Sequence, residues 1–137
     1  MFKCFYPDFY LDSTYEIDFK AWYAEGYRGL IFDIDNTLVP HGAPADDRAK
    51  ALFCHLKELG YRVVLLSNNK EPRVKLFHDD VHVPYIHKAG KPGIRNYCKA
   101  MEMMGCDTSN TLFIGDQLFT DVWGAKRAVI RTILVRP

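Results

Sequence analysis

The sequence predicts an α/β protein with three layers, in which helices cover both faces of a parallel sheet. Short apolar runs without polar alternation, such as LIF at 30–32 and VVLL at 63–66, are typical of strands buried on both faces. Stretches with apolar residues at helical spacing separate these runs, as parallel strands require. Polar residues follow the ends of the runs, where a parallel sheet binds its ligands. A length of 137 residues indicates one domain, 1–137.

The first 27 residues form an aromatic-rich arm that includes a short helix. Asp18 is a suitable N-cap and Gly26 a suitable stop for this helix, which is expected to end near Glu25. We expect the arm, residues 1–27, to pack over an edge of the sheet. The alternative is that its Phe and Tyr side chains face a membrane interface, although the arm lacks the polybasic cluster that reinforces such binding.

Strands and helices alternate through the rest of the chain. We expect strands at 28–35, 61–66, 83–86, 111–114 and 132–135. We expect helices at 46–59, 72–79, 92–104 and 119–128. Asp46 caps the first of these helices, which carries an apolar stripe and ends at Gly60. Pro72 suits the first turn of the next helix, and Gly105 ends the third.

The composition excludes several classes of function. A net charge of +1 provides no basic field of the kind that nucleic-acid binders use, so no nucleic-acid partner is expected. No apolar run approaches the roughly 20 residues of a membrane span, and the N-terminus has no signal-peptide pattern. The four cysteines form no CxxC pair, which argues against zinc or a disulfide framework. Cys54 and Cys98 are expected to be small core residues. Because the cysteines show no disulfide pattern, the protein is expected to be reduced and cytoplasmic.

Chemistry-bearing side chains follow four of the predicted strands. Because the carboxyl ends of parallel strands meet at one edge of a sheet, we expect these side chains to lie together. They are Asp33, Asp35, Ser67, Asn68, Lys88, Lys91, Asp116 and Asp121. Three carboxylates, those of Asp33, Asp35 and Asp116, suit a hard divalent cation such as Mg²⁺. A cation, a lysine and hydrogen-bond donors around a carboxylate are what phosphoryl transfer requires.

Four motifs resemble those of the haloacid dehalogenase (HAD) superfamily and occur in the same order. They are DIDNT at 33–37, Ser67 after a strand, Lys91 before Pro92 at a helix start, and GDQLFTD at 115–121. The resemblance runs from about residue 28 to residue 135. It implies a Rossmann-like HAD-type fold and a phosphoric monoester hydrolase with Mg²⁺ as its cofactor.

The resemblance also implies roles for the motif residues. Asp33 would be the nucleophile that forms an aspartyl-phosphate, and Asp35 would be the general acid and then the general base. Asp33, the backbone carbonyl of Asp35, and Asp116 would hold the metal, with Thr37 and Asp121 in support. An aspartate two residues after the nucleophile indicates a phosphatase, because transport ATPases carry threonine there and the dehalogenases lack this acid.

Phosphate binding is implied for Ser67, Asn68 and Lys91. Ser67 and the backbone amides that follow its strand can donate hydrogen bonds to phosphate oxygens. Lys88 lies close to Lys91 in the sequence, so either lysine could be the functional one.

The gaps between the motifs leave no room for a cap domain. Only 29 residues separate Thr37 from Ser67, and 23 separate Ser67 from Lys91. The site is therefore expected to be open, which suits a bulky substrate or closure by a neighbouring subunit in a homo-oligomer.

The capless layout, together with PDFYLDSTYEIDF at 7–19 and SNN and KAGKP in the second and third motif regions, resembles the bacterial YqeG-type branch of subfamily IIIA. That branch is similar to mitochondrial phosphatidylglycerophosphate phosphatases. The resemblance implies a phosphorylated lipid or small molecule as substrate, acted on by a protein peripheral to the membrane. Members of the branch are expected to continue into a basic tail, whereas this sequence ends at Pro137.

Two alternatives come from other classes of protein. A phospho-accepting receiver domain also carries an aspartate at a strand end, but it needs no acid two residues after the acceptor. A catalytically weak binding protein on the same fold would have no need to keep Asp33, Asp35, Lys91 and Asp116. The sequence therefore favours a Mg²⁺-dependent phosphomonoesterase.

Overall fold

Six parallel strands form one sheet in the part of the chain that the structure describes. This computed structural model describes residues 8–88, 90, 91 and 93–136. The strands lie in the order β1-β6-β5-β2-β3-β4. Their bounds are β1 (Phe9–Leu11), β2 (Gly29–Phe32), β3 (Arg62–Leu66), β4 (Tyr85–Ile86), β5 (Thr111–Gly115) and β6 (Arg131–Val135). The predicted α/β class with a parallel sheet is confirmed.

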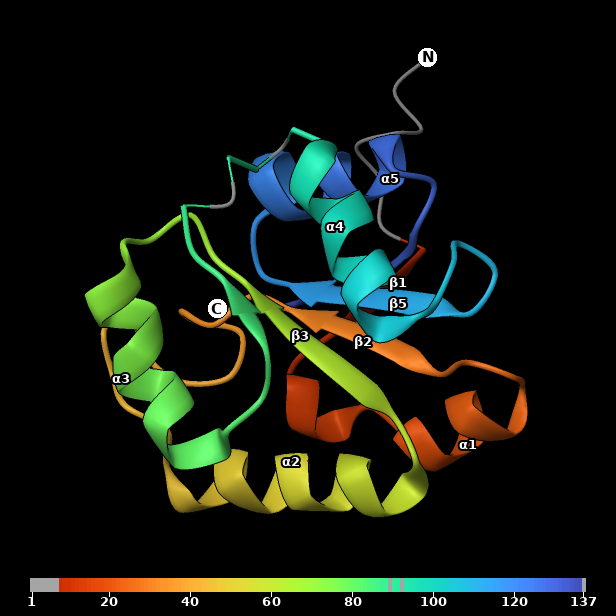
Figure 1. The fold of residues 1–137 in the computed structure, drawn as a ribbon. Helices are drawn as coiled ribbons and strands as arrows, with labels where there is room; N and C mark the ends of the chain where they lie inside the picture. Colours follow the sequence, from red (N-terminus) through yellow and green to blue (C-terminus); the bar gives the residue numbers. More distant parts are fainter. Residues whose placement is uncertain (1–7, 89, 92, 137) are drawn as a thin grey trace.

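Helices cover both faces of this sheet, as Figure 1 shows. One face carries α1 (Phe19–Ala24), α2 (Asp47–Leu59) and α3 (Glu71–Val81), and the other carries α4 (Arg95–Met104) and α5 (Gly124–Arg127). A 3-10 helix, η2 (Thr14–Glu16), precedes α1, and a π-helix, η3 (Leu118–Trp123), precedes α5. Within the described residues, no helix combines the length and the apolar character needed to cross a membrane.

The strands are apolar along their length because both of their faces are buried. In β2, Leu30 and Phe32 pack with residues of α1, α2 and α3, whereas Ile31 packs with residues of α4 and α5. All three side chains are fully buried. Since alternate residues of a strand face opposite sides of the sheet, a two-sided core removes the polar alternation.

The caps predicted from the sequence are confirmed at both ends of the helices. The carboxylates of Asp18 and Asp46 accept backbone N–H groups in the first turns of α1 and α2. Helix α2 ends at Gly60 with a φ of 103°, and α4 ends at Gly105 with a φ of 64°. Glycine adopts this left-handed conformation without steric cost, so both helices stop where the pattern indicates.

The aromatic arm contributes a strand to the sheet. Strand β1 pairs in parallel with β6, with Phe9 opposite Ile133. Packing of the arm at the sheet edge is thus confirmed for its described part, although the strand itself was not predicted. A three-residue run is too short to show a strand pattern in the sequence. Residues 1–7 of the arm lie outside the described residues.

The predicted burial of Cys54 and Cys98 is wrong. Both residues are exposed. Helix α2 turns Ala49, Phe53 and Leu56 toward the sheet, so the residue after Phe53 lies about 100° around the helix from the buried stripe. In α4 the buried residues likewise include Tyr97, which leaves its neighbour Cys98 outside.

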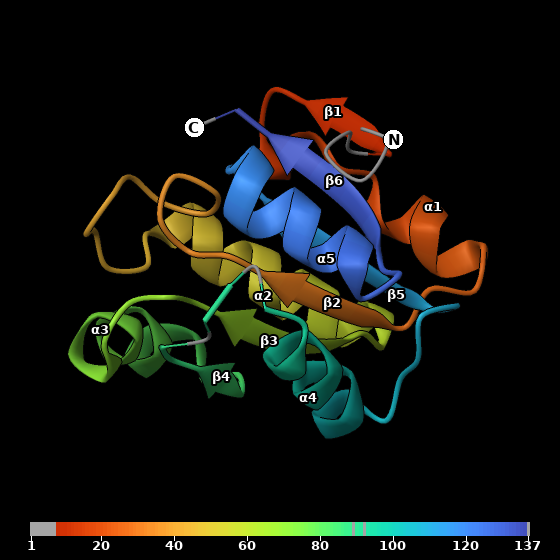
Figure 2. The ribbon, with the colours of Figure 1, turned by 90° about the horizontal axis from the view of Figure 1, so that it is seen from above.

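The sheet topology determines where a ligand site can form. From β2, the chain proceeds outward through β3 to β4, whereas β5, β6 and β1 lie on the other side of β2. The arrows of β1, β6, β2 and β3 point to the same side in Figure 2. Ligands of such sheets bind outside the carboxyl ends of the strands, where the strand order reverses. Here this position lies between β2 and β5.

Candidate active site

Two carboxylates meet where β2 and β5 end side by side. Asp33 follows β2, Asp116 follows β5, and the N–H of Asp33 donates to the carbonyl of Ile114 at 3.0 Å. The hydroxyl of Thr37 lies 3.4 Å from Oδ2 of Asp33 and 3.3 Å from Oδ1 of Asp116. The structure therefore brings together two acids from different motifs, with Thr37 between them.

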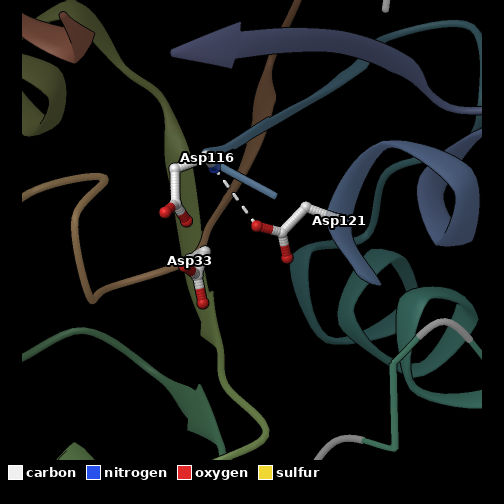
Figure 3. A group of neighbouring side chains, drawn as sticks. All are labelled: Asp33, Asp116 and Asp121. Carbon is white, nitrogen blue, oxygen red and sulfur yellow. Dashed lines mark hydrogen bonds between the residues drawn. The ribbon is translucent and has the colours of Figure 1, made fainter. Parts of the chain in front are cut away.

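Asp121 joins this pair and completes an acidic cluster of Asp33, Asp116 and Asp121 (Figure 3). One carboxylate oxygen of each residue lies within 4.8 Å of the others. The Nζ of Lys91 lies 2.9 Å from Oδ1 of Asp33 and 2.7 Å from Oδ1 of Asp121, and its side chain is 3% exposed. Three carboxylates and one ammonium leave two uncompensated negative charges in the cluster.

This crowding changes the proton affinities of the groups. Burial, and then the charge of Asp33, raises the pKa of Asp116 to about 7 and the pKa of Asp121 to about 6. Burial alone would lower the pKa of Lys91, but the carboxylates of Asp121 and Asp33 outweigh it and raise that pKa. The lysine is therefore charged, and the cluster still lacks positive charge.

Asp121 contacts both Lys91 and the loop after β5. Its Oδ2 accepts the N–H groups of Asp116 at 3.2 Å and Gln117 at 3.1 Å. The π-helix η3 carries Asp121 and directs its carboxylate toward the end of β5. The single helix predicted at 119–128 is replaced by η3 and α5. Gly115 permits the approach, because a Cβ there would lie 2.6 Å from Oδ2 of Asp121. Both oxygens of Asp121 thus already accept hydrogen bonds.

A side chain in the segment after β3 holds the backbone of Lys91. The side chain of Asn68 accepts the N–H of Lys91 at 2.7 Å and donates to its carbonyl at 3.2 Å. The buried hydroxyl of Ser67 accepts the N–H of Asn69 at 3.0 Å. Of the two candidate lysines, Lys91 lies in the acidic cluster and Lys88 is exposed. The contact of Asn68 with Lys91 was not predicted from the sequence.

The carboxylate of Asp35 is held apart from the acidic cluster by other donors. Its Oδ1 accepts the N–H of Gly42 at 2.7 Å and both Nε and Nη2 of Arg73 at 3.0 and 2.7 Å. Its Oδ2 accepts Nδ2 of Asn69 at 2.6 Å. Burial alone would raise the pKa of Asp35, but the hydrogen bonds from Arg73 and Gly42 outweigh it and hold that pKa below its usual value. The predicted metal contact of Asp35 uses its backbone carbonyl, so it stays a prediction.

Sequence reasoning missed Asn69 and Arg73. The available signal was weak, because Asn69 follows the Ser67 motif and Arg73 lies in the first turn of a predicted helix. Asn69 ends the SNN stretch, which indicated a motif region but no role for this side chain, and Arg73 belongs to no recognisable pattern.

A family model described as haloacid dehalogenase-like hydrolase matches residues 40–128. The chain belongs to the haloacid dehalogenase-like hydrolase family. The matched segment of this HAD-like hydrolase contains Ser67, Lys91 and Asp116, and Asp33 and Asp35 lie shortly before it.

Curated relatives of this HAD-like hydrolase carry phosphatase names. The Bacillus subtilis (strain 168) protein named "Probable phosphatase YqeG" is 39% identical, over 98% of this chain and 79% of that protein. "Phosphatidylglycerophosphate phosphatase 1, chloroplastic" from Chlamydomonas reinhardtii is 32% identical, over 88% of this chain and 49% of that protein. The chain thus spans about half of the algal relative. The predicted enzyme class, a phosphoric monoester hydrolase, is confirmed, and so is the resemblance to the YqeG-type branch.

Solved structures share the fold of this HAD-like hydrolase. The cobalt-bound deoxy-D-mannose-octulosonate 8-phosphate phosphatase from Haemophilus influenzae matches with a TM-score of 0.58 at 15% identity, over 82% of this chain and 80% of that one. A HAD phosphatase from Thermococcus onnurineus matches with a TM-score of 0.58 at 16% identity, over 78% and 85% of the two chains. The predicted Rossmann-like HAD-type fold is therefore confirmed.

Proposed function

We propose that this HAD-like hydrolase is a Mg²⁺-dependent phosphatase that cleaves phosphomonoesters through an aspartyl-phosphate on Asp33. The observation that supports this mechanism is the convergence of Asp33, Asp116 and Lys91 at the carboxyl end of the sheet. Phosphoryl transfer depends mainly on positioning and on neutralisation of charge. The cluster contains side chains suited to both tasks.

The acidic cluster fits a hard divalent cation. With all three carboxyl groups ionised it carries two uncompensated negative charges, and its oxygens approach within 4.8 Å, which is the kind of ligand set that Mg²⁺ prefers. Asp33, Asp116 and the backbone carbonyl of Asp35 would hold the ion, since the oxygens of Asp121 already accept hydrogen bonds from Lys91 and two backbone N–H groups. Bound Mg²⁺ would neutralise charge on the phosphoryl group.

Side chains of the protein carry out the covalent steps of this proposal. An oxygen of Asp33 attacks phosphorus, and the bond to the leaving oxygen breaks as that oxygen takes a proton from the protonated form of Asp35. Water then attacks the phosphorus of the aspartyl-phosphate and gives a proton to Asp35, which releases phosphate and restores Asp33. Lys91, Ser67 and the backbone at Asn68 bind the phosphoryl oxygens during both steps.

The first test measures phosphate release from an aryl phosphate in the presence of Mg²⁺. We expect Asp33→Asn to lower the rate by on the order of 10³-fold or more, because an amide cannot attack phosphorus. Removal of the metal by a chelator should have a comparable effect. Asp79→Asn is the matched control, since Asp79 is exposed on α3. Full activity of Asp33→Asn, or of the chelated enzyme, would refute the mechanism.

A phosphorylated lipid is the substrate that we propose. Two curated relatives are named phosphatidylglycerophosphate phosphatase 1, and the chain spans 49% and 38% of their lengths. The short segments between the motifs also leave the site open to a bulky substrate at a membrane surface. Closure of the site by a second copy of the chain stays a prediction.

The substrate test compares kcat/KM for phosphatidylglycerophosphate in mixed micelles with values for sugar phosphates and nucleoside monophosphates. We expect the lipid to be preferred by about tenfold or more, which corresponds to about 1.4 kcal/mol of additional transition-state binding. Equal values across the panel would contradict the lipid proposal and leave the phosphatase mechanism intact.

A further inference from the structure

A cavity of about 400 Å³ lies at the same edge of the sheet as the acidic cluster. Asp12 and Ser13, which directly follow β1, line it together with Arg136, which directly follows β6. Residues 36–40 of the loop after β2 form another wall. Thr37 belongs to this wall, and its hydroxyl lies between the two acids that follow β2 and β5. The cavity therefore adjoins the acidic cluster.

Helix η2 holds the loop that forms this wall. The buried hydroxyl of Thr14 donates to the carbonyl of Thr37 at 2.6 Å, and the hydroxyl of Tyr15 donates to the carbonyl of Leu38 at 2.7 Å. Both donors come from a segment that precedes β2 in the chain. The wall is thus held in place by the fold itself, which lowers the cost of ordering it when a ligand binds.

A guanidinium group without a carboxylate partner faces this cavity. Arg48, in the first turn of α2, lines the cavity with its guanidinium carbon 3.9 Å from the centre of the Tyr15 ring. The ion pairs found among the described residues do not include Arg48. Asp46 lies outside the lining, and its carboxylate is engaged as the N-cap of α2. The charge of Arg48 is therefore available to a ligand.

The second guanidinium of the cavity, that of Arg136, is only weakly engaged. It lies 3.5 Å from Oδ1 of Asp12, but both side chains are largely exposed, and such ion pairs are weak. Two guanidinium groups and one carboxylate give the lining a net charge of +1. The acidic cluster beside it is negative. One site therefore suits a cation and the other an anion.

A phosphodiester is an anion that fits this cavity. It carries a single negative charge, and its oxygens match the planar donors of guanidinium groups. Val39 and Pro40 add apolar atoms to the lining, against which the carbons next to such a group can pack. In phosphatidylglycerophosphate, a phosphodiester and a phosphomonoester are joined to the same glycerol unit. With its phosphomonoester at Asp33, such a substrate would have its second anionic group nearby in the leaving group.

We propose that Arg48 and Arg136 form a subsite that binds a phosphodiester in the leaving group of the substrate. This inference rests on the proposed function, because it describes the leaving-group side of the same site. The two arginines bind the substrate and take no part in the making or breaking of bonds. Their removal should therefore raise KM for substrates that carry the second anion and leave other substrates nearly unaffected.

The test compares two soluble substrates that share a glycerol phosphate end. Glycerophosphoglycerol phosphate, the deacylated form of phosphatidylglycerophosphate, carries the phosphodiester, whereas glycerol 3-phosphate does not. We expect the double variant Arg48→Met/Arg136→Met to lower kcat/KM by about 30-fold on the first substrate, chiefly through a higher KM. On glycerol 3-phosphate the loss should be less than about threefold.

Asp12→Asn should act in the opposite direction. Without the competing carboxylate, Arg136 is free to bind the substrate, so KM for glycerophosphoglycerol phosphate should fall by about twofold. This variant provides the test if the double variant fails to fold. Arg131→Met is the matched control, because Arg131 is an exposed arginine at the amino end of β6. It should leave the kinetics on both substrates unchanged.

Three results would overturn this inference. They are equal losses on the two substrates, an unchanged KM for glycerophosphoglycerol phosphate in the double variant, and an equal loss on 3-phosphoglycerate, which offers a carboxylate in place of the phosphodiester. Failure of the proposed function looks different, since the unsubstituted enzyme would then release no phosphate from any of the three substrates.

Discussion

Asp121 illustrates how much one buried side chain organises at the residue scale. It is almost fully buried, at 1% exposure, and its two oxygens accept hydrogen bonds from Lys91, Asp116 and Gln117. These contacts align the lysine with the acidic cluster and fix the loop that carries Asp116. They are possible only because Gly115 has no Cβ. The glycine of the GDQLFTD motif is thus a packing requirement of the site.

Gly115→Ala should therefore disturb the site from within the sheet. The added Cβ would lie 2.6 Å from Oδ2 of Asp121, so Asp121 must move. We expect a loss of roughly 1–3 kcal/mol in the free energy of unfolding, together with at least a tenfold loss of kcat. Urea denaturation and phosphate release measure the two effects.

Gly29→Ala is a control with similar crowding far from the acids. Its Cβ would lie 2.9 Å from Sγ of Cys106, at the amino end of β2. This variant should lose stability and keep its kcat. The proposed packing role of Gly115 fails if Gly115→Ala keeps its kcat or if Gly29→Ala loses as much.

The junction between β1 and β6 depends on Asp8 at the element scale. Its Oδ2 accepts the N–H of Thr132 at 2.9 Å, and its Oδ1 lies 2.9 Å from Nζ of Lys126. The N–H of Asp8 in turn lies 3.2 Å from the hydroxyl oxygen of Thr132. A short strand of three residues has few ladder bonds of its own, so these contacts secure the arm against β6.

Asp8→Ala should loosen this edge of the sheet. We expect a loss of about 1–2 kcal/mol in the free energy of unfolding, because a buried backbone donor of Thr132 loses its partner. Asp12→Ala is the matched control. Asp12 is 66% exposed and pairs with Arg136 at 3.5 Å, so its removal should cost less than about 0.5 kcal/mol. Equal losses in the two variants would contradict this role of Asp8.

The same contact predicts a dependence of stability on pH. Burial alone would raise the pKa of Asp8, but hydrogen bonds from Lys126 and Thr132 outweigh it and lower that pKa below 3.8. A carboxyl group whose pKa is lower in the folded state than in the unfolded state stabilises the fold at pH values above its unfolded-state pKa. This stabilisation is lost as the pH falls through the folded-state pKa. The difference in stability between the unsubstituted protein and Asp8→Ala should therefore be constant above about pH 5 and shrink below pH 3.8. Urea denaturation at several pH values measures it.

The whole molecule brings together charges that repel one another. The acids come from the ends of β2 and β5 and from η3, and Lys91 comes from the segment before α4. The ladders of the parallel sheet hold these segments in register, so the carboxylates cannot separate without disturbing the core. The fold therefore stores electrostatic repulsion that a cation would relieve.

Mg²⁺ should stabilise the whole fold through this cluster. At 100 times the dissociation constant, one bound ion adds about 2.7 kcal/mol, which should raise Tm by about 5 °C or more. Above pH 7, where Asp116 is ionised, Asp116→Asn removes one of the repelling charges, so this variant should melt at a higher temperature than the unsubstituted protein without metal. It should also lose most of the response to Mg²⁺. Calorimetry with and without Mg²⁺ measures both shifts.

Two calorimetric results would speak against a cation site here. One is the absence of any shift with Mg²⁺ in the unsubstituted protein. The other is an equal shift in Asp116→Asn.

The parts of the fold predicted from the sequence follow from local chemistry. Runs of apolar residues, acidic N-caps, and glycines such as Gly60 and Gly105 each specify a conformation with few alternatives. The position of the acids at strand ends also follows, because all parallel strands present their carboxyl ends to one edge. For this reason the sequence predicts that Asp33, Asp116 and Lys91 lie at the same edge of the sheet.

By itself the sequence determined the strands β2 to β6, the caps and the group of acids at one edge. Each of these is encoded in residues close together in the chain or follows from the shared direction of parallel strands. Only the tertiary structure decided the pairing of β1 with β6, the exposure of Cys54 and Cys98, and the position of Lys91, not Lys88, beside the acids. It alone brought Arg73 to Asp35. These contacts join residues that are distant in sequence, and no local pattern records which surfaces will meet when the core closes.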